Sequence, residues 1–182
     1  MPAARPSGTT AASITSQPES MTAFRPSLRF VASHPAHLVA FGFGAGLSPV
    51  GPGTAGTLLA WAVGGFFAAA YPPALALAIL GALFVAGVWA CGVTGRHLGV
   101  ADHGGMVWDE FVAFLLVLLV LPDSLAWQAA GFALFRLFDI VKPPPIRGFE
   151  RRFHGGFGVM FDDLLAAGYT LLALAIVKRL FY

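Results

Sequence analysis

The sequence predicts an all-α, multi-pass transmembrane helical bundle, and two observations support this fold class. First, 57% of the 182 residues are hydrophobic and only 11% are charged, whereas about a quarter of the residues in a soluble domain are charged. Second, the apolar residues form several stretches that approach the roughly 20 residues a helix needs to cross a bilayer. We expect one membrane domain over residues 34–182, preceded by a disordered tail over residues 1–33 that is rich in Ser, Thr, Pro and Ala.

The first apolar stretch, residues 36–57, is interrupted by glycine and proline: Gly42, Gly44, Gly46, Pro49, Gly51, Pro52, Gly53 and Gly56. A plain helix is not expected there, because both residue types disfavour a helix interior. Irregular backbone at membrane depth persists only where protein covers it or where it lines a wet cavity. This Gly/Pro-rich segment can therefore be re-entrant, and it is a candidate wall of a polar site.

Regular apolar stretches follow at residues 54–70, 74–91, 106–121, 125–140 and 158–177. Each is expected to be a helix, with tight breaks at 71–73 and 122–123 and longer, more polar connections at 92–105 and 141–157. The stretches 106–121 and 125–140 are short for a membrane crossing, so this hairpin is tilted or only partly inserted. The prediction is accordingly a bundle of four to five apolar helices.

Basic residues near the ends of these stretches predict the orientation of the chain. With a cytosolic N-terminus, most Lys and Arg residues lie inside, as the positive-inside rule requires, and only Lys178 and Arg179 lie outside. The same topology gathers most of the carboxylates at the cytosolic edge: Asp102, Asp109, Glu110, Asp139, Glu150, Asp162 and Asp163. The net charge of +2, spread over scattered basic residues, favours membrane lipids and not nucleic acid as partners.

Adjacent carboxylates begin two of the apolar stretches. Asp109 and Glu110 follow Trp108, and Asp162 and Asp163 repeat the arrangement at the last stretch. Acids at a helix start gain about 0.3–1 kcal/mol from the helix dipole, which is the simplest explanation. Ionised groups at a membrane interface are costly, however, and usually pair, face a cavity or hold an ion. We therefore expect these residues to converge on a metal site.

Asp139 lies at the other end of a helix, where the negative dipole end disfavours a carboxylate unless a cation compensates. It either pairs with Arg136, three residues earlier, or helps to hold the metal. His154 and His103 lie in polar connections near the acids. Either imidazole can donate a proton to a leaving group or make an ordinary loop hydrogen bond.

Carboxylates in a chain with few histidines and one cysteine, Cys91, indicate a hard, oxygen-seeking cation. Mg²⁺ typically takes one or two carboxylates, several waters and the phosphate oxygens of a substrate, so a phosphate compound is the expected substrate. The connection after Asp139 supplies Lys142 and Arg147, and Arg can bind phosphate through two parallel hydrogen bonds. Cytosolic loops are basic in any membrane protein, so topology alone also explains these two cations.

Three blocks of sequence together resemble one family. They are residues 42–49 and 52–57 (GFGAGLSP and PGTAGT), residues 102–104 and 107–112 (DHG and VWDEFV), and residues 135–147 and 154–163 (FRLFDIVKPPPIR and HGGFGVMFDD). In this order they resemble bacterial phosphatidylglycerophosphatase A over about residues 35–175. The resemblance implies an Mg²⁺-dependent phosphatase of the bacterial inner membrane, with its site facing the cytosol, that converts phosphatidylglycerophosphate to phosphatidylglycerol.

The resemblance also implies the site residues. The implied metal ligands, which are also catalytic, are Asp109, Glu110, Asp139, Asp162 and Asp163. The implied further residues are His154 in catalysis and, near the phosphate, Lys142, Arg147 and Thr54. Attack by an activated water is the expected mechanism, and a hydroxyl nucleophile from the glycine-rich loop is its alternative: Ser48, Thr54 or Thr57.

Rival functions come from other classes of protein. Acids in a membrane also form ion relays, but a conduction path needs polar residues at the bilayer midplane, and residues 115–120 and 171–176 are purely apolar. A non-catalytic membrane subunit does not explain carboxylates gathered on one edge. A phosphotransferase that joins a lipid to an alcohol usually carries an Asp-Gly-x-x-Ala-Arg string, which this sequence lacks.

Overall fold

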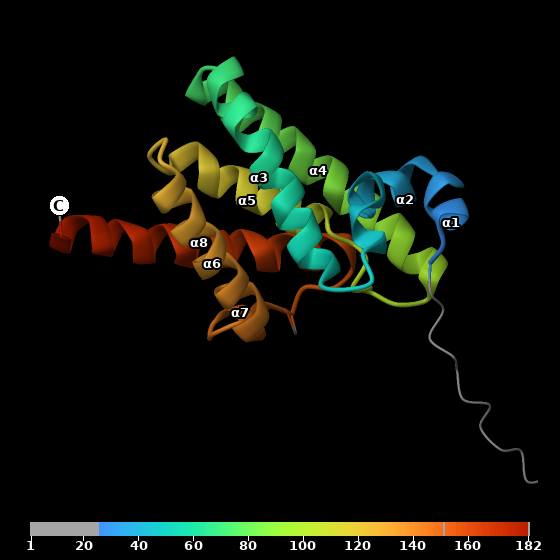
Figure 1. The fold of residues 1–182 in the computed structure, drawn as a ribbon. Coiled ribbons are helices and arrows are strands. Elements are labelled where there is room, and N and C mark those ends of the chain that lie inside the picture. The colour runs from blue at the N-terminus through green and yellow to red at the C-terminus, as the bar shows by residue number, and fades with distance from the viewer. Residues whose placement is uncertain (1–25, 151, 182) are drawn as a thin grey trace, which may run out of the picture.

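A computed structural model of the protein describes residues 26–150 and 152–181, and every regular element in this part of the chain is helical (Figure 1). The elements are α1 (Leu28–Ala32), α2 (Pro35–Ala40), the 3-10 helix η1 (Gly42–Leu47), α3 (Pro52–Ala70), α4 (Pro73–Leu98), α5 (Trp108–Val120), α6 (Leu125–Val141), α7 (Ile146–Glu150) and α8 (Gly155–Phe181). The all-α prediction is confirmed, and α3, α4, α5, α6 and α8 occupy the predicted apolar stretches. Most of the predicted tail lies outside the described residues, and α1 falls within its last part.

The Gly/Pro-rich segment is irregular, as expected, although short helices interrupt it. Between α2 and α3 the backbone enters the left-handed region at Phe43 (φ 56°), Gly44 (φ 105°) and Gly51 (φ 56°). Proline at the first position of α3 is compatible with a helix, because the amide that it lacks has no partner there in any case. The irregular part therefore ends at residue 51, earlier than the predicted residue 57.

Helix α4 continues seven residues beyond the predicted residue 91, through a sequence that resembles a polar connection. The reason is tertiary packing at its glycines. A side chain on Gly156 of α8 would overlap the α4 backbone at Val88 and Gly92, so the two helices approach closely where both lack side chains. The helix ends at Gly99, whose left-handed conformation (φ 70°) lets its amide donate to Arg96 and Gly95 carbonyls.

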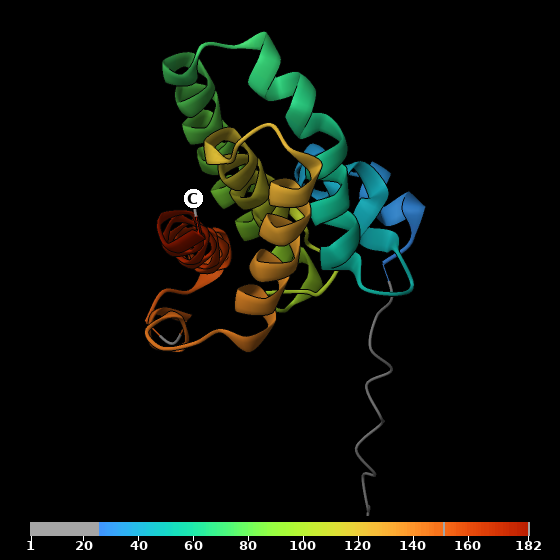
Figure 2. The same ribbon diagram turned by 60° about the vertical axis from the view of Figure 1, so that its left-hand side comes forward.

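Three helices are long and apolar enough to cross a membrane: α3, α4 and α8. Helix α5 has 13 residues and is therefore only about 20 Å long, against roughly 30 Å for the hydrocarbon core. It lies in the middle of the bundle, in contact with α3, α4 and α8, and most of its side chains are buried. The α5–α6 hairpin is thus the short element of the bundle, and Figure 2 shows it beside α8, which is seen nearly end-on.

Glycines on α3 bring that helix against the start of α5. A Cβ atom on Gly56 would lie 2.7 Å from the Val107 Cβ, and one on Gly64 would overlap the Leu118 side chain. Real side chains there would push the two helices apart. The close approach matters for function because it carries the N-terminal end of α3 to the acidic start of α5.

Candidate metal and phosphate site

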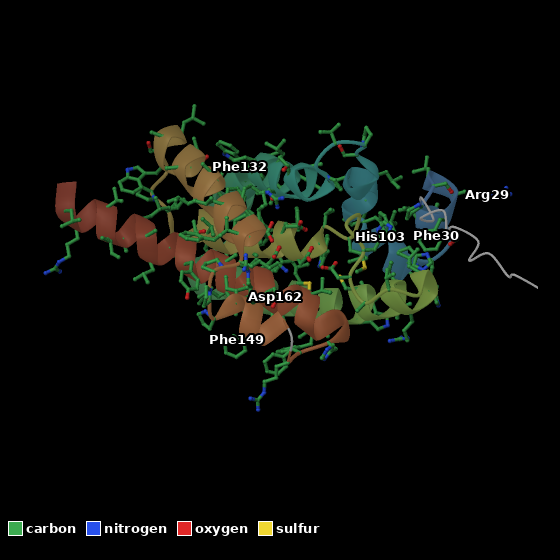
Figure 3. All side chains as sticks on the ribbon, turned by 90° about the horizontal axis from the view of Figure 1, so that it is seen from below. Arg29, Phe30, His103, Phe132, Phe149 and Asp162 are labelled. Atoms are coloured by element: carbon green, nitrogen blue, oxygen red, sulfur yellow. The ribbon has the colours of Figure 1, made fainter. Side chains whose placement is uncertain are left out.

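Three carboxylates from two helices meet inside the bundle. Asp109 and Glu110 occupy the first turn of α5, and Asp163 lies on α8; one oxygen from each residue lies within 4.8 Å of the others. We refer to these three residues as the carboxylate trio. Figure 3 labels the neighbouring Asp162 on α8, well inside the helical body. The prediction that Asp162 and Asp163 begin the last helix is wrong, because α8 begins at Gly155 and carries no acid in its first turn; both residues lie about two turns inside it. Three of the four paired acids nevertheless converge.

The trio is buried, and each of its residues keeps one oxygen without a hydrogen bond. Asp109 is 6% exposed and Asp163 is 4% exposed. Within the described part of the chain, no hydrogen bond reaches Asp109 Oδ1, Glu110 Oε2 or Asp163 Oδ2. Burying an ionised carboxylate costs several kcal/mol unless a cation or hydrogen-bond donors compensate. The arrangement fits a hard divalent cation, because it offers oxygen ligands that converge and that no side chain satisfies.

Asp139 lies beside the trio and is paired with Arg136. The Arg136 Nη1 atom is 2.7 Å from Asp139 Oδ2, one turn later on α6, and 3.5 Å from Glu110 Oε1 on α5. The pairing considered from the sequence is therefore present. It does not remove Asp139 from the site, since the same guanidinium also contacts a member of the trio.

Lys142 and Asp162 form a second ion pair at the same edge. The Lys142 Nζ atom lies 3.4 Å from Asp162 Oδ2 and links the end of α6 to α8. Lys142 caps α6 in the left-handed conformation (φ 43°), which is uncommon for a residue with a side chain and often marks functional sites. The Lys142 amino group therefore contacts the residue that directly precedes the trio member Asp163.

The remaining predicted residues lie further from these contacts. Arg147 is exposed, and its Nη2 donates to the Val141 carbonyl at 2.9 Å. His154 is exposed directly before α8, and Thr54 is half-buried in the first turn of α3. No described contact joins these three residues to the trio. They are not part of the ion-pair network described above.

The Gly/Pro-rich segment forms the wall of a pocket of about 340 Å³, and His103 and Gly104 lie on its other side. Pro52, also on the wall, directly precedes Gly53, next to which lie Glu110 and Arg136. The His103 Nδ1 atom accepts the Gly105 amide at 3.0 Å, so its Nε2 is left for other partners. The expectation that this segment lines a cavity is met, and the cavity adjoins the carboxylates.

Two of the three alternative nucleophiles, Thr57 and Ser48, make local hydrogen bonds. The Thr57 hydroxyl is fully buried and donates to the Gly53 carbonyl at 2.9 Å, and the Ser48 hydroxyl donates to the Val50 carbonyl at 2.8 Å. Both bonds are local contacts within the loop or helix. Neither hydroxyl is prepared by a neighbouring base among the described residues, which favours water as the attacking group.

The sequence did not identify two participants, Arg136 as a partner of Glu110 and Gly53 as the residue against which both side chains lie. The signal for Gly53 is its place three residues before Gly56, on the face of α3 that approaches α5. The contact between Arg136 and Glu110 joins residues 26 positions apart, so only the packing of α5 against α6 could reveal it.

Comparisons with known proteins agree on one family. The chain matches the sequence model of a family described as Phosphatidylglycerophosphatase A over residues 38–178. It is 41% identical over 160 residues to the Phosphatidylglycerophosphatase A of Haemophilus influenzae, which covers 87% of this chain and 98% of that protein. It is 44% identical over 140 residues to the Phosphatidylglycerophosphatase A of Escherichia coli, covering 76% of this chain and 80% of that protein.

A third relative, from Bacteroides thetaiotaomicron, is 42% identical over 149 residues, covering 78% of this chain and 92% of that protein. Its name assigns it a phosphatidylinositol-3-phosphatase activity only provisionally. No solved structure matches the chain.

Proposed function

Because the chain belongs to the phosphatidylglycerophosphatase A family, we propose that it hydrolyses the terminal phosphate monoester of phosphatidylglycerophosphate, with Mg²⁺ as cofactor, and releases phosphatidylglycerol. The observation that carries this proposal is the buried carboxylate trio of Asp109, Glu110 and Asp163, which converge and each keep one buried oxygen without a hydrogen bond. A site of this kind suits a substrate that brings its own anionic oxygens together with a metal ion.

The trio would hold the ion, with Asp139 and Asp162 close by as further carboxylates. A divalent cation bound there supplies positive charge to the phosphate and makes a bound water a better nucleophile. The chain's own contribution is to hold the ligands in place: α5 and α8 carry the trio, and the surrounding helices exclude bulk water from it.

Cations of the chain would compensate the charge of the substrate. Lys142 can move its amino group from Asp162 to a phosphate oxygen without leaving the site, since the present contact is 3.4 Å long. Arg147 and Thr54 are proposed to contact the phosphate from the rim. The leaving alcohol needs a proton, and the exposed His154 is the imidazole that we propose as its donor.

The proposed location is the bacterial inner membrane, with the carboxylates at its cytosolic face. Support comes from the basic residues: Arg96 and Arg152 lie toward the carboxylate end of the chain's long helices, and few basic residues lie at the other end. The lipid substrate can then reach the site from the leaflet, with its headgroup in the pocket lined by His103 and Pro52.

The test is phosphate release from a panel of lipid phosphates by the purified protein in detergent micelles, with Mg²⁺ and after exhaustive chelation. We expect phosphatidylglycerophosphate to be hydrolysed fastest and chelation to abolish turnover. Phosphatidylinositol 3-phosphate belongs in the panel because of the third relative, and faster release from it would replace the proposed substrate. Full activity after chelation would exclude the metal-dependent mechanism.

A further inference from the structure

Arg136 connects the carboxylate trio to the rest of the charged network. It projects from α6, and its Nη1 atom approaches Asp139 Oδ2 at 2.7 Å and Glu110 Oε1 at 3.5 Å. Its side chain is 15% exposed and that of Glu110 is 12% exposed, so solvent screens this contact only weakly. A single guanidinium thus contacts carboxylates from two helices, one of which is a predicted ligand of the metal.

The start of α3 leaves room for this contact. A Cβ atom on Gly53 would overlap Glu110 Oε1 and would lie 3.0 Å from Arg136 Nη2 and 3.1 Å from Nη1. Any residue larger than glycine would therefore displace the carboxylate or the guanidinium. Gly53, Glu110 and Arg136 form one contact at the meeting point of α3, α5 and α6, which we refer to as the Gly53 contact.

The two oxygens of Glu110 have different environments. Oε1 lies 3.5 Å from the positively charged Arg136 Nη1 and next to Gly53, whereas Oε2 is buried and accepts no hydrogen bond from the residues that the structure describes. A carboxylate gripped at one oxygen can present the other in a defined direction. Partners that orient a metal ligand in this way are usually worth 10–100-fold in metal affinity or activity, as a rough guide.

We propose that Arg136 is a positioning residue: it fixes Glu110 through Oε1 so that Oε2 remains directed to a divalent cation shared with Asp109 and Asp163. This rests on the proposed function in one respect, namely that the carboxylate trio binds such a cation. The role differs from that of Lys142, because Arg136 contacts a member of the trio, whereas Lys142 contacts Asp162, which is not a member. It acts on the reaction through Glu110 and makes no contact with the phosphate.

The positive charge of Arg136 and its proposed positioning of Glu110 have opposite effects on metal binding. A positive charge beside a cation site repels the cation, so its removal should tighten binding if charge were all that Arg136 contributed. If Arg136 orients Glu110, its removal should weaken binding in spite of the more favourable charge. The sign of the change therefore separates the two roles.

The experiment measures Mn²⁺ binding to the purified protein by electron paramagnetic resonance, in detergent and without lipid. Arg136→Gln is expected to raise the Mn²⁺ dissociation constant roughly 10–100-fold. Arg136→Lys should fall between Arg136→Gln and the wild type, since it keeps the charge but not the planar fork. Arg179→Gln, at the exposed far end of α8, is the matched control and should bind as the wild type does. Unchanged or tighter binding by Arg136→Gln overturns the proposal.

A second pair of variants tests the contact without removing a charge. Gly53→Ala should weaken Mn²⁺ binding, because the new methyl group displaces Glu110 Oε1, whereas Gly65→Ala, on the same helix, has open space around it and should bind normally. Alanine favours a helix more than glycine does, so loss of folding is not expected from the helix itself. Wild-type binding by Gly53→Ala would show that the Gly53 contact does not position Glu110.

Kinetics separate positioning from phosphate binding. At saturating Mg²⁺, Arg136→Gln should lower kcat and leave the KM for the lipid phosphate nearly unchanged. A raised KM with an unchanged kcat would assign Arg136 to the phosphate and would contradict the proposal. If the wild type hydrolyses no lipid phosphate, the proposed function fails, while the Mn²⁺ measurements still decide the role of Arg136.

Discussion

Two buried polar groups in this apolar chain differ in whether the chain satisfies them. At the junction of α2 and α4, the His37 ring is 3% exposed; its Nδ1 lies 3.1 Å from the Phe30 carbonyl and its Nε2 lies 2.8 Å from His97 Nδ1. Since a carbonyl only accepts, His37 Nδ1 donates to it and Nε2 accepts the proton of His97. In the carboxylate trio, by contrast, Asp109 and Asp163 each keep a buried oxygen without a donor in the described structure.

The difference teaches how a structural polar group is distinguished from a functional one. The buried imidazoles of His37 and His97 replace hydrogen bonds to water by a hydrogen bond to each other. This bond stabilises the packing of α2 against α4. In the trio only Glu110 has a cation of the described chain beside it, one oxygen of each residue has no donor, and like charges face one another. Such an arrangement lowers the stability of the protein unless a cation compensates it, which is the role we propose for the metal ion. The two regions should therefore respond in opposite ways to substitution.

The largest effect is expected in the trio. Asp109→Asn and Asp163→Asn keep the shape but remove a charged ligand, so the rate of phosphate release should fall by more than the roughly 100-fold that a lost outer partner costs. The unfolding temperature without metal should rise or stay the same, because one of three mutually repelling charges is gone. Phosphate release and thermal unfolding of the purified variants measure the two effects. A variant that releases phosphate at the wild-type rate, or that unfolds at a lower temperature than the wild type, would contradict the functional interpretation of the trio.

A smaller effect is expected at the cations. Lys142→Met should raise the KM for the lipid phosphate roughly tenfold or more, since a charge-assisted hydrogen bond contributes about 1.5–3 kcal/mol. Arg147→Met should change it less than about fivefold, because exposed ion pairs contribute only about 0–1 kcal/mol. Steady-state kinetics on the same lipid micelles compare the two. Equal losses would mean that Arg147 turns toward the phosphate in spite of its contact with Val141.

The smallest effect on activity is expected at the histidines. His37→Leu removes the acceptor of the His97 proton and the imidazole donor to the Phe30 carbonyl, which still accepts from the Ser33 hydroxyl. It should cost about 1–3 kcal/mol of unfolding free energy while kcat changes little. Denaturant titration and phosphate release measure both quantities. A large loss of kcat without a loss of stability would show that His37 and His97 have a functional and not a structural role.

The same histidine predicts a pH dependence of stability. Burial lowers the pKa of His37 below its ordinary 6.5, although its hydrogen bond to the Phe30 carbonyl acts in the opposite direction. A folded-state pKa that is lowered gives stability that is complete above pH 6.5 and is lost as the pH falls toward the lowered pKa. The unfolding temperature of the wild type should accordingly decrease below pH 6.5. His37→Leu should flatten this decrease, and an unchanged slope would assign it to other groups.

Much of the fold and part of the site could be predicted without coordinates. Composition and the length of the apolar stretches determine an all-α membrane bundle, because a bilayer leaves a backbone few alternatives to helices. Paired acids in two apolar stretches also indicated that Asp109, Glu110 and Asp163 would be neighbours, although only the first pair lies at a helix start. These predictions rest on local physics, in which the cost of a charge or of an unpaired amide can be read residue by residue.

Only the tertiary structure could decide which acids pair with a cation of the chain and which meet in the trio. Asp162 lies next to Asp163 in the sequence, yet it contacts Lys142 and is not in the trio, whereas the adjacent Asp109 and Glu110 both are, so adjacency along a helix does not decide membership. Glu110 is shared with Arg136 because glycines let α3, α5 and α6 approach closely, which is a property of three helices together. Sequence spacing gives the residue types available for a site, and the packing of separate helices selects which of them meet.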